Sequence, residues 1–344
     1  MTAFAPGRAN LIGEHTDYND GLGLPFAIEQ GVRVSAERRD GVEIVAQALD
    51  LGEAESFALA DTAKRRTGDW TDFVRGTIGE LTAAGCELPG ARLEITGNVP
   101  EGAGLSSSAA IEVALSLALL GLAGIPEPED RVTLARLCSR VENDWVGAHT
   151  GLLDPLASLF GERDHALRID FQTLEIRPVP LRLGDWTLGT VPSGETHSLA
   201  HSGYNERREE TERARRALGL ESLRDARPED VVRLPDPLDR RVRHLIEENA
   251  RVEATVAALE AGDLAEIGRI LNASHASLRD LYDSSTDAVE RTVTRLRDDG
   301  AAGARMMGGG FGGHVLALFP PDAAAPADAQ VVAPSTGARL LDSE

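Results

Sequence analysis

Short runs of alternating apolar and polar residues dominate the first part of the chain. Residues 31–37 (GVRVSAE) and 42–46 are rich in β-branched residues and flank a turn-like RRDG, which predicts a hairpin. Residues 92–97 (RLEITG) predict a further strand. A run rich in glycine and serine follows, and residues 107–124 then have the composition of a helix that glycines end. The predicted order in this part is strand, glycine loop, helix.

Helical periodicity is the main pattern in the rest of the chain. Helices are predicted over residues 128–143, 204–219, 240–261, 264–281 and 287–298. Residues 168–180 (RIDFQTLEIRPVP) predict strand, turn and strand. Residues 306–320 (MMGGGFGGHVLALFP) predict a second glycine loop that feeds a strand, before a low-complexity loop and a last extended segment. Strands and helices are therefore mixed, as in an α+β protein.

The chain length favours two domains. At 344 residues the chain is longer than one hydrophobic core usually supports. We place the boundary near Pro178, which gives an N-terminal domain of residues 1–178 and a C-terminal domain of residues 179–344. We expect an ordered N-terminus, and an extreme C-terminus that packs back on a core.

Charge and composition exclude several classes of partner. The formal net charge of −21 repels phosphate backbones and anionic lipids, so we expect neither nucleic acid nor a membrane as partner. The longest apolar run, residues 111–123, contains Glu112 and is too short to span a bilayer. Cys86 and Cys138 have no CxxC spacing, which indicates neither zinc nor a disulfide framework. We therefore expect a cytoplasmic protein.

The first glycine loop has the chemistry of a phosphate site. It comprises Gly102, Ala103, Gly104, Leu105, Ser106, Ser107 and Ser108. Small residues let the backbone approach a ligand closely, and free amides at a helix start attract anions. The alternative is a tight turn in which a serine caps the helix, although three consecutive serines leave hydroxyl groups to spare.

Other nucleotide-binding motifs do not fit this loop. The P-loop needs a lysine that the loop lacks, because Lys64 is the single lysine of the chain. The HRD and DFG motifs of protein kinases are absent from the sequence, and the GxGxxG pattern of dinucleotide-binding folds is not matched. A nucleotide bound here must rely on backbone amides, the helix dipole and Mg²⁺.

The start of the chain concentrates ionisable groups. Residues 7–21 read GRANLIGEHTDYNDG and hold Arg8, Glu14, His15 and Asp17 between glycines. These types can donate and accept hydrogen bonds at fixed positions on a polar ligand such as a sugar. The alternative is that they pair with neighbours on a surface loop.

Three motifs together resemble those of the GHMP small-molecule kinases. They are APGRANLIGEHTDYNDG, NVPEGAGLSSSAAIE and GGGFGG, in that order, and the first resembles the galactokinase signature. The resemblance covers residues 5–338. It implies a two-lobed α+β fold, with an N-terminal domain like ribosomal protein S5 domain 2 and a ferredoxin-like C-terminal domain. It also implies transfer of a phosphoryl group from ATP to α-D-galactose, giving galactose 1-phosphate as the entry to the Leloir pathway.

The resemblance assigns roles to individual residues. It implies that the sugar is bound by Glu14, His15, Thr16, Asp17, Gly151 and Tyr204. A packed aromatic ring with a satisfied hydroxyl is the alternative for Tyr204.

Asp154 resembles the catalytic base, and Arg8 the cation that orients it and stabilises the transferring phosphoryl group. The sequence Asp154–Pro155 also has the pattern of a helix N-cap with proline at the first helical position. The family usually has glutamine in place of Pro155, which changes the support of the base.

The metal and nucleotide sites follow from the same resemblance. It implies that residues 102–108 bind ATP and that Ser108 and Glu142 bind Mg²⁺. Expected partners are D-galactose and ATP, and the expected state is a monomer or weak dimer. Alternatives are a related kinase for arabinose, galacturonate or N-acetylgalactosamine, and a galactose sensor without turnover. Such sensors damage the GLSSSA loop, which is intact in this chain.

Overall fold

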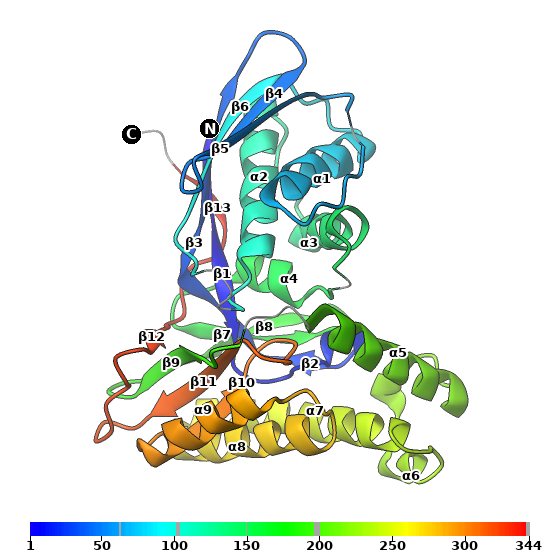
Figure 1. Ribbon diagram of the computed structural model, residues 1–344, viewed down its shortest axis with the longest axis vertical. Helices are drawn as coiled ribbons and strands as arrows, with labels where there is room; N and C mark the ends of the chain where they lie inside the picture. The colour runs from blue at the N-terminus through cyan, green and yellow to red at the C-terminus, as the bar shows by residue number, and fades with distance from the viewer. Residues whose placement is uncertain (62, 101–103, 149, 196–199, 342–344) are drawn as a thin grey trace.

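The computed structural model describes residues 1–61, 63–100, 104–148, 150–195 and 200–341. Figure 1 shows two parts along the long axis of the molecule. The upper part is built on a six-stranded sheet, and long helices lie along the bottom of the lower part. Strands and helices are mixed in both, which confirms the expected α+β class.

The six-stranded sheet has the order β13-β1-β3-β6-β4-β5. Its strands are β1 (Thr2–Asn10), β3 (Pro25–Arg38), β4 (Glu43–Ala48), β5 (Glu53–Ala58), β6 (Ala91–Gly97) and β13 (Arg339–Leu341). The predicted hairpin of residues 31–37 and 42–46 is wrong, because β6 lies between β3 and β4. Alternation identifies a strand and its buried face, but it does not identify the partner strand.

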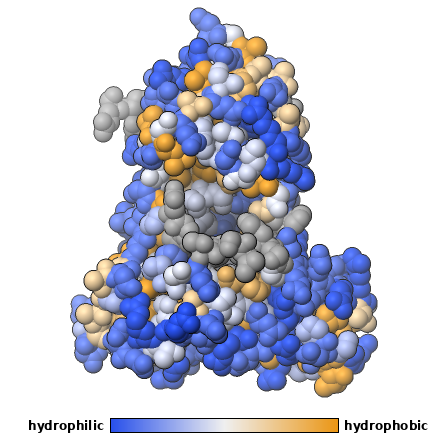
Figure 2. All heavy atoms as spheres, viewed as in Figure 1, coloured by the Kyte–Doolittle hydropathy of each residue, from blue (hydrophilic) through white to orange (hydrophobic). Residues whose placement is uncertain are grey.

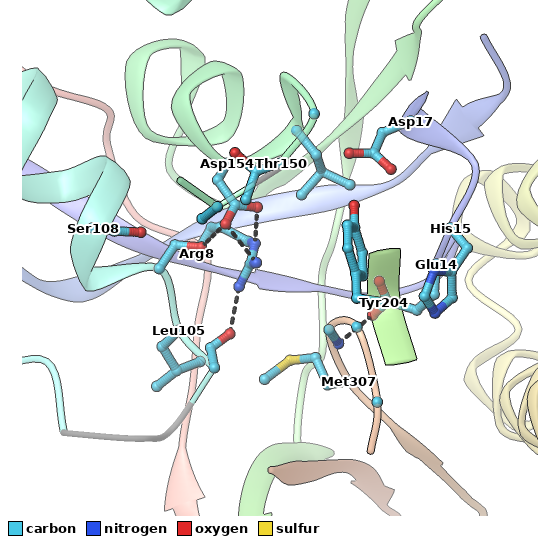
Figure 3. A pocket seen from close by; sticks show the side chains of 18 of the residues that line it. Arg8, Glu14, His15, Asp17, Leu105, Ser108, Thr150, Asp154, Tyr204 and Met307 are labelled. Carbon is cyan, nitrogen blue, oxygen red and sulfur yellow. Dashed lines mark hydrogen bonds and ion pairs between the residues drawn. The ribbon is translucent and has the colours of Figure 1, made fainter. Parts of the chain in front are cut away.

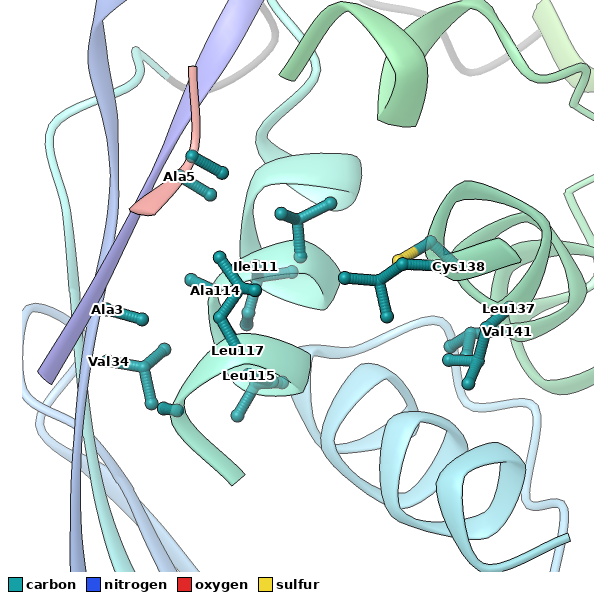
Figure 4. Close-up of a cluster of buried hydrophobic side chains, with 14 of the residues drawn as sticks. Ala3, Ala5, Val34, Ile111, Ala114, Leu115, Leu117, Leu137, Cys138 and Val141 are labelled. Atoms are coloured by element: carbon teal, nitrogen blue, oxygen red, sulfur yellow. The ribbon is translucent and has the colours of Figure 1, made fainter. Parts of the chain in front are cut away.

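Four helices and a π-helical segment lie on one side of this sheet (Figure 1). They are α1 (Trp70–Ala83), α2 (Ser107–Ala123), α3 (Arg131–Arg140), η2 (Val141–Val146) and α4 (Leu153–Phe160). Helices α2 and α4 pack against its strands, and the other three segments pack on these helices and on one another. Every residue of α2 from Ala109 to Leu120 is buried, as expected for a helix that is apolar on all sides. Figure 4 shows Ala114 of α2 near Ala3 and Ala5 of β1, where small side chains let the helix lie close to the sheet.

The lower part contains a four-stranded sheet in the order β10-β11-β9-β12. Its strands are β9 (Thr187–Pro192), β10 (Gly303–Met306), β11 (His314–Phe319) and β12 (Gln330–Val331). The helices of this part are α5 (Ala200–Leu218), α6 (Pro228–Val231), α7 (Leu238–Ala261), α8 (Leu264–Asp280) and α9 (Asp287–Asp298), with short 3-10 turns η1 (Asp17–Asn19) and η4 (Leu223–Asp225). The long helices predicted from periodicity are confirmed, and Gly219 ends α5 with a φ of 68°.

A small sheet lies between the two parts (Figure 1). It has the order β2-β7-β8, with β2 (Leu22–Gly23), β7 (His165–Asp170) and β8 (Ile176–Pro180). The antiparallel pairing of β7 with β8 confirms the predicted strand, turn and strand.

Both ends of the described chain are held in the upper sheet. Thr2 pairs with Leu341, and the amino group of Met1 donates to the carbonyl oxygen of Ala36 at 2.8 Å. The expectation of an ordered N-terminus is confirmed. The expected packing of the extreme C-terminus is confirmed as far as Leu341, and residues 342–344 lie outside the described residues. The charged loop after β1 is therefore fixed at its start by a central strand.

The surface in Figure 2 is largely hydrophilic, with separate apolar residues between the charged ones. Such scattered apolar residues are ordinary for a folded protein. None of the helices in the described part of the chain has both the length and the apolar character that a membrane span requires.

Candidate active site

A cavity of about 480 Å³ opens where the upper and lower parts meet (Figure 3). It is lined by Pro100 and by residues from five segments, within residues 8–17, 104–108, 148–154, 204–205 and 307–310. The N-terminal motif, the glycine-serine loop and the second glycine run are therefore brought to one place. Gly102 and Ala103 of the predicted loop lie outside the described residues.

Arg8 and Asp154 form the centre of this cavity. Arg8 Nε lies 2.7 Å from Asp154 Oδ1, and Nη2 lies 2.8 Å from Oδ2. Arg8 Nη1 donates to the carbonyl oxygen of Gly104 at 2.5 Å, and its backbone N–H donates to that of Leu105 at 3.0 Å. A side chain at Gly7 would collide with the Leu105 carbonyl, so glycine there lets β1 approach the loop. The two side chains are 10% and 20% exposed, which shields the pair from bulk water.

Ser106 holds the same carboxylate. It is the N-cap residue of α2 but makes no capping hydrogen bond with its side chain, and its hydroxyl donates to Asp154 Oδ2. The alternative, a serine side chain that caps the helix, is therefore not observed at Ser106, although this residue occupies the N-cap position. Bonds to charged acceptors are the stronger ones, which favours Asp154 over the helix amides. Asp154 is not an N-cap either: Leu152 occupies that position, and Asp154 is the second residue of α4 and faces Arg8.

The residues expected to contact the sugar line one side of the cavity, with Thr16 as the exception. Glu14, His15, Asp17, Gly151 and Tyr204 all line it. The hydroxyl of Thr16 is buried and bonds to the carbonyl oxygens of Gly13 and Leu22, so it supports the loop instead. Thr16 therefore differs from its neighbours in this motif, because its hydroxyl is used within the protein and does not line the cavity.

Asp17 and Gly151 are packed tightly together. A side chain at position 151 would occupy the place of the Asp17 carboxylate, so glycine is required there. Burial, together with the negative charge of Asp154, raises the pKa of Asp17 to about 6. Asp17 therefore remains ionised above this pH and accepts hydrogen bonds there.

His15 has an unusual backbone and a neutral ring. Its φ is 62°, in the left-handed region that residues other than glycine rarely adopt. Burial lowers its pKa to about 3, and the nearby His244 and Arg207 act in the same direction. The imidazole is therefore uncharged at neutral pH, and it can act as a donor at one nitrogen and an acceptor at the other.

Glu142 lies behind the cavity wall, on η2. The hydroxyl of Thr150 donates to its Oε2, and the hydroxyl of Ser108 also bonds to its carboxylate. Burial and the charge of Asp154 raise the pKa of Glu142. Ser108 and Glu142 together offer hard oxygen atoms of the kind that Mg²⁺ prefers. Among the described residues no group of three or more His, Cys, Asp or Glu side chains is arranged to hold a metal. Such a group is not required for Mg²⁺ bound with a nucleotide, because this ion usually takes only one or two ligands from the protein.

Sequence reasoning missed Arg305 and Thr150. Arg305 is fully buried on β10, and its Nη2 lies 2.8 Å from Glu14 Oε1. The N–H of Gly308 donates to the same oxygen at 2.8 Å, which leaves Glu14 Oε2 without a donor among the described residues. The sequence did contain one signal for Arg305: a charged residue inside an apolar strand that leads into a glycine run. Its partner is 291 positions away, so the sequence did not indicate the pair.

Fold and site together define a small-molecule kinase of the GHMP type. The model of the GHMP kinases N terminal domain matches residues 72–162, and that of the GHMP kinases C terminal matches residues 255–337. The galactokinase galactose-binding signature matches residues 1–38, which carry Arg8 and Asp17. These matches confirm the expected two-lobed GHMP kinase fold.

Known proteins with similar sequences and structures support a narrower assignment. A galactokinase of Thermotoga neapolitana is 40% identical over 319 residues, which cover 92% of this chain and 89% of the relative. The crystal structure of Lactococcus lactis galactokinase complexed with galactose superposes with a TM-score of 0.91 and 32% identity, covering 99% of this chain and 95% of that chain. The Methanococcus jannaschii mevalonate kinase shares the fold. It superposes with a TM-score of 0.70 and 19% identity, covering 94% of this chain and 92% of that chain. This chain belongs to the galactokinase family.

Proposed function

We propose that this chain transfers the γ-phosphoryl group of ATP to the anomeric hydroxyl of α-D-galactose. The observation that carries the proposal is the Arg8–Asp154 pair, which lies in the same cavity as the residues of the galactokinase signature. Phosphoryl transfer asks mainly for positioning and charge stabilisation, and this pair supplies both. The galactose in the superposed L. lactis structure supports the choice of sugar.

In this proposal Glu14, His15, Asp17, Gly151 and Tyr204 bind the sugar. The two carboxylates accept hydrogen bonds from sugar hydroxyls, and the close approach of Gly151 to Asp17 keeps the wall at that point free of a side chain. A hexose has several hydroxyls at fixed angles, so a set of fixed acceptors and donors selects among sugars. Thr16 keeps the loop in shape and does not contact the sugar.

Asp154 is the proposed acceptor of the anomeric proton, through Oδ1. Among the described residues, Oδ2 receives two hydrogen bonds, from Arg8 and Ser106, whereas Oδ1 receives one, from Arg8. A carboxylate oxygen has about two lone pairs, so Oδ1 retains the capacity to accept a proton. Arg8 keeps N–H groups that its three side-chain bonds do not use, and these stabilise charge on the transferring phosphoryl group.

The glycine-serine loop and the start of α2 are proposed to hold the phosphates of ATP. Helix α2 presents its N-terminal amides next to Ser107 and Ser108, and the chain provides no P-loop lysine. The oxygen donors of Ser108 and Glu142 fit Mg²⁺, which would neutralise phosphate charge when bound. Glu142 is held in place by Thr150.

The organisation of the chain completes the proposal. We propose an N-terminal domain of residues 1–178 and a C-terminal domain of residues 179–344. The proposed boundary lies between the ranges that the two GHMP domain models match. As an ATP-dependent sugar kinase, the protein is proposed to act in the cytoplasm, as a monomer or weak dimer.

A coupled assay of ADP release tests this function. Galactose, arabinose, galacturonate and N-acetylgalactosamine are compared at equal concentrations, and the product is identified by phosphorus NMR as an anomeric phosphate. We expect the highest kcat/KM with galactose, and loss of turnover in the Asp154→Asn variant. A preference for another sugar would overturn the substrate assignment, and binding of galactose and ATP without turnover would overturn the kinase assignment.

A further inference from the structure

All three tyrosines of the chain, Tyr18, Tyr204 and Tyr282, surround the imidazole of His15. The ring centroids of Tyr282 and Tyr204 lie 4.5 Å and 5.5 Å from that of His15, and Tyr18 meets it edge-on at 5.9 Å. Tyr204 lines the cavity, whereas Tyr282, between α8 and α9, is 1% exposed and is not part of its lining. The proposed reaction has so far given Tyr282 no role.

A chain of hydrogen bonds connects Tyr282 to His15. The Tyr18 hydroxyl lies 2.9 Å from His15 Nδ1 and 3.0 Å from the Tyr282 hydroxyl. Within the described part of the chain, the Tyr282 hydroxyl has no other partner, and His15 Nε2 has none although it is buried. The protein therefore contacts one nitrogen of the imidazole and leaves the other for the cavity that His15 lines.

The two neutral tautomers of His15 differ in the donors that they leave unpaired. A neutral imidazole and a tyrosine hydroxyl each carry one hydrogen on the bonding atoms. If His15 Nδ1 donated to Tyr18, these two links would hold three donor hydrogens, and one of the two tyrosine hydroxyl hydrogens would have no acceptor in them, at a cost of about 1–3 kcal/mol when it is buried. If Tyr282 donates to Tyr18 and Tyr18 to Nδ1, both hydroxyl hydrogens are used. The remaining donor is then Nε2–H of His15, which the ligand cavity can satisfy.

A second observation agrees with the proton on Nε2. The backbone of Gly309 acts to raise the pKa of His15, as a carbonyl oxygen facing a ring N–H does, although burial is the larger effect. Gly309 belongs to the glycine run that lines the same cavity. Gly309 thus favours a ring N–H on the side of the cavity, although Nε2 has no hydrogen-bond partner among the described residues.

The position of Tyr282 is fixed independently of His15. The ring of His244 lies 4.5 Å from that of Tyr282. His244 Nε2 donates to the carbonyl oxygen of Glu14 at 3.2 Å, and Nδ1 accepts from the hydroxyl of Ser277 at 2.8 Å, because a carbonyl oxygen can only accept. Arg207 donates to the Tyr282 carbonyl oxygen at 3.4 Å. The tyrosine is therefore held firmly enough to impose a direction on the chain.

We propose that Tyr282, acting through Tyr18, is a positioning residue that fixes His15 as the Nε2–H tautomer and so makes it a donor to the bound sugar. The inference rests on the proposed function and deepens it. The neighbouring carboxylates of Glu14 and Asp17 can only accept hydrogen bonds when ionised. A sugar hydroxyl that donates to one of them still has lone pairs, and the Nε2–H group serves these. The site thereby selects sugars whose hydroxyl at this point both donates and accepts.

Nitrogen NMR of the ligand-free chain tests the tautomer without any sugar. The eight histidines are labelled with nitrogen-15, and the His15 signals are identified by their loss in the His15→Gln variant. We expect Nε2 protonated and Nδ1 unprotonated in the wild-type protein near neutral pH. In Tyr282→Phe we expect a mixture of tautomers, because Tyr18 no longer receives a hydrogen bond that fixes its direction. An Nδ1–H tautomer in the wild type would overturn the proposal, whether or not the variant folds.

Steady-state kinetics test the consequence for the sugar. In Tyr282→Phe we expect the KM for galactose to rise roughly threefold to tenfold, with kcat changed by no more than about twofold. Tyr18→Phe removes both bonds and should have at least as large an effect. Thr292→Val is the control, because it removes a buried hydroxyl of α9, bonded to Ala288, that does not line the cavity.

The outcomes separate this inference from the proposed function. Absence of galactose turnover in the wild type would overturn the function, while the NMR result would still decide the tautomer. Wild-type KM and wild-type tautomer in a folded Tyr282→Phe protein would overturn the positioning role and leave the function intact. Circular dichroism and thermal melting establish whether each variant is folded.

Discussion

Arg8 and Asp154, 146 positions apart in the sequence, share two hydrogen bonds of 2.7 Å and 2.8 Å between one guanidinium and one carboxylate. The geometry uses the planar fork of arginine, which presents two parallel N–H groups to two oxygens. Ser106 and the Gly104 carbonyl complete the arrangement. The orientation of the proposed base is therefore set by a cation from β1 and a hydroxyl from the start of α2.

Replacing Arg8 with lysine should test whether this geometry, and not charge alone, supports catalysis. A lysine is a point charge that cannot make the two parallel bonds, so the carboxylate loses its fixed orientation. We expect kcat to fall by about 10²-fold or more, the size of loss seen when a transition-state donor is removed. The control is Arg243→Lys on α7, an exposed arginine paired with Glu247. A kcat within about threefold of wild type would contradict the proposed role.

Asp17 should give the sugar affinity a pH dependence. Its pKa of about 6 means that it is protonated below this pH and can no longer accept from a sugar hydroxyl in the same way. We expect 1/KM for galactose to fall as pH decreases through about 6. Asp17→Asn should raise KM by about tenfold or more and remove this inflection. A pH profile that the variant leaves unchanged would assign the titration to another group.

The raised pKa of Asp17 also predicts that its ionised form, although it helps to bind the sugar, lowers the stability of the fold. The folded pKa of Asp17 is above its unfolded value near 3.8, so the folded state favours the protonated form. Its contribution to stability is complete below that value and is lost as pH rises through about 6. We therefore expect Asp17→Asn to increase the free energy of unfolding by about 3 kcal/mol above neutral pH, with little change in strong acid. Urea denaturation of wild type and variant, above neutral pH and in strong acid, measures the difference in the free energy of unfolding. A variant less stable than wild type above neutral pH would contradict the prediction.

Glu142 and Ser108 should be tested by metal binding as well as by activity. Mn²⁺ replaces Mg²⁺ and is followed by electron paramagnetic resonance in the presence of a nonhydrolysable ATP analogue. We expect Glu142→Gln to weaken Mn²⁺ binding roughly 10- to 100-fold, because it removes a charged oxygen ligand. Glu266→Gln, on the exposed side of α8, is the matched control. Equal Mn²⁺ affinity in the variant and the wild type would exclude Glu142 as a ligand.

The sequence predicted the local elements well because their signals are local. The long helix α8 and the end of α5 at Gly219 follow from periodicity and from the conformational freedom of glycine. The order of the upper sheet could not be predicted in this way. Whether β4 pairs with β3 or with β6 depends on contacts between segments far apart, and alternation is the same in both cases.

The site shows the same division between local and distant causes. Motifs identified Arg8 and Asp154, and the structure brings them together. The sequence suggested that a serine would cap α2, because the local helix amides are the obvious partners. In the structure the Ser106 hydroxyl is bound instead to Asp154, 48 positions away. A competition of this kind depends on a partner that only the folded chain supplies.

Arg305 should link the second glycine run to the sugar side of the cavity. It is fully buried, bonded to Glu14 and to the carbonyl oxygens of Asn10, Leu11 and Met306. Arg305→Met would leave the Glu14 carboxylate and several carbonyls without these donors. We expect a loss of about 3–5 kcal/mol in the free energy of unfolding, the usual result of removing one partner of a buried pair.

The milder Arg305→Lys variant separates stability from binding. It keeps the charge but cannot reach all four acceptors from one nitrogen, so Glu14 should lose its fixed position. We expect the KM for galactose to rise more than kcat falls. A double-mutant cycle with Glu14→Gln should give a coupling energy of about 1 kcal/mol or more in sugar binding. Additive effects would show that Arg305 supports the fold without positioning Glu14.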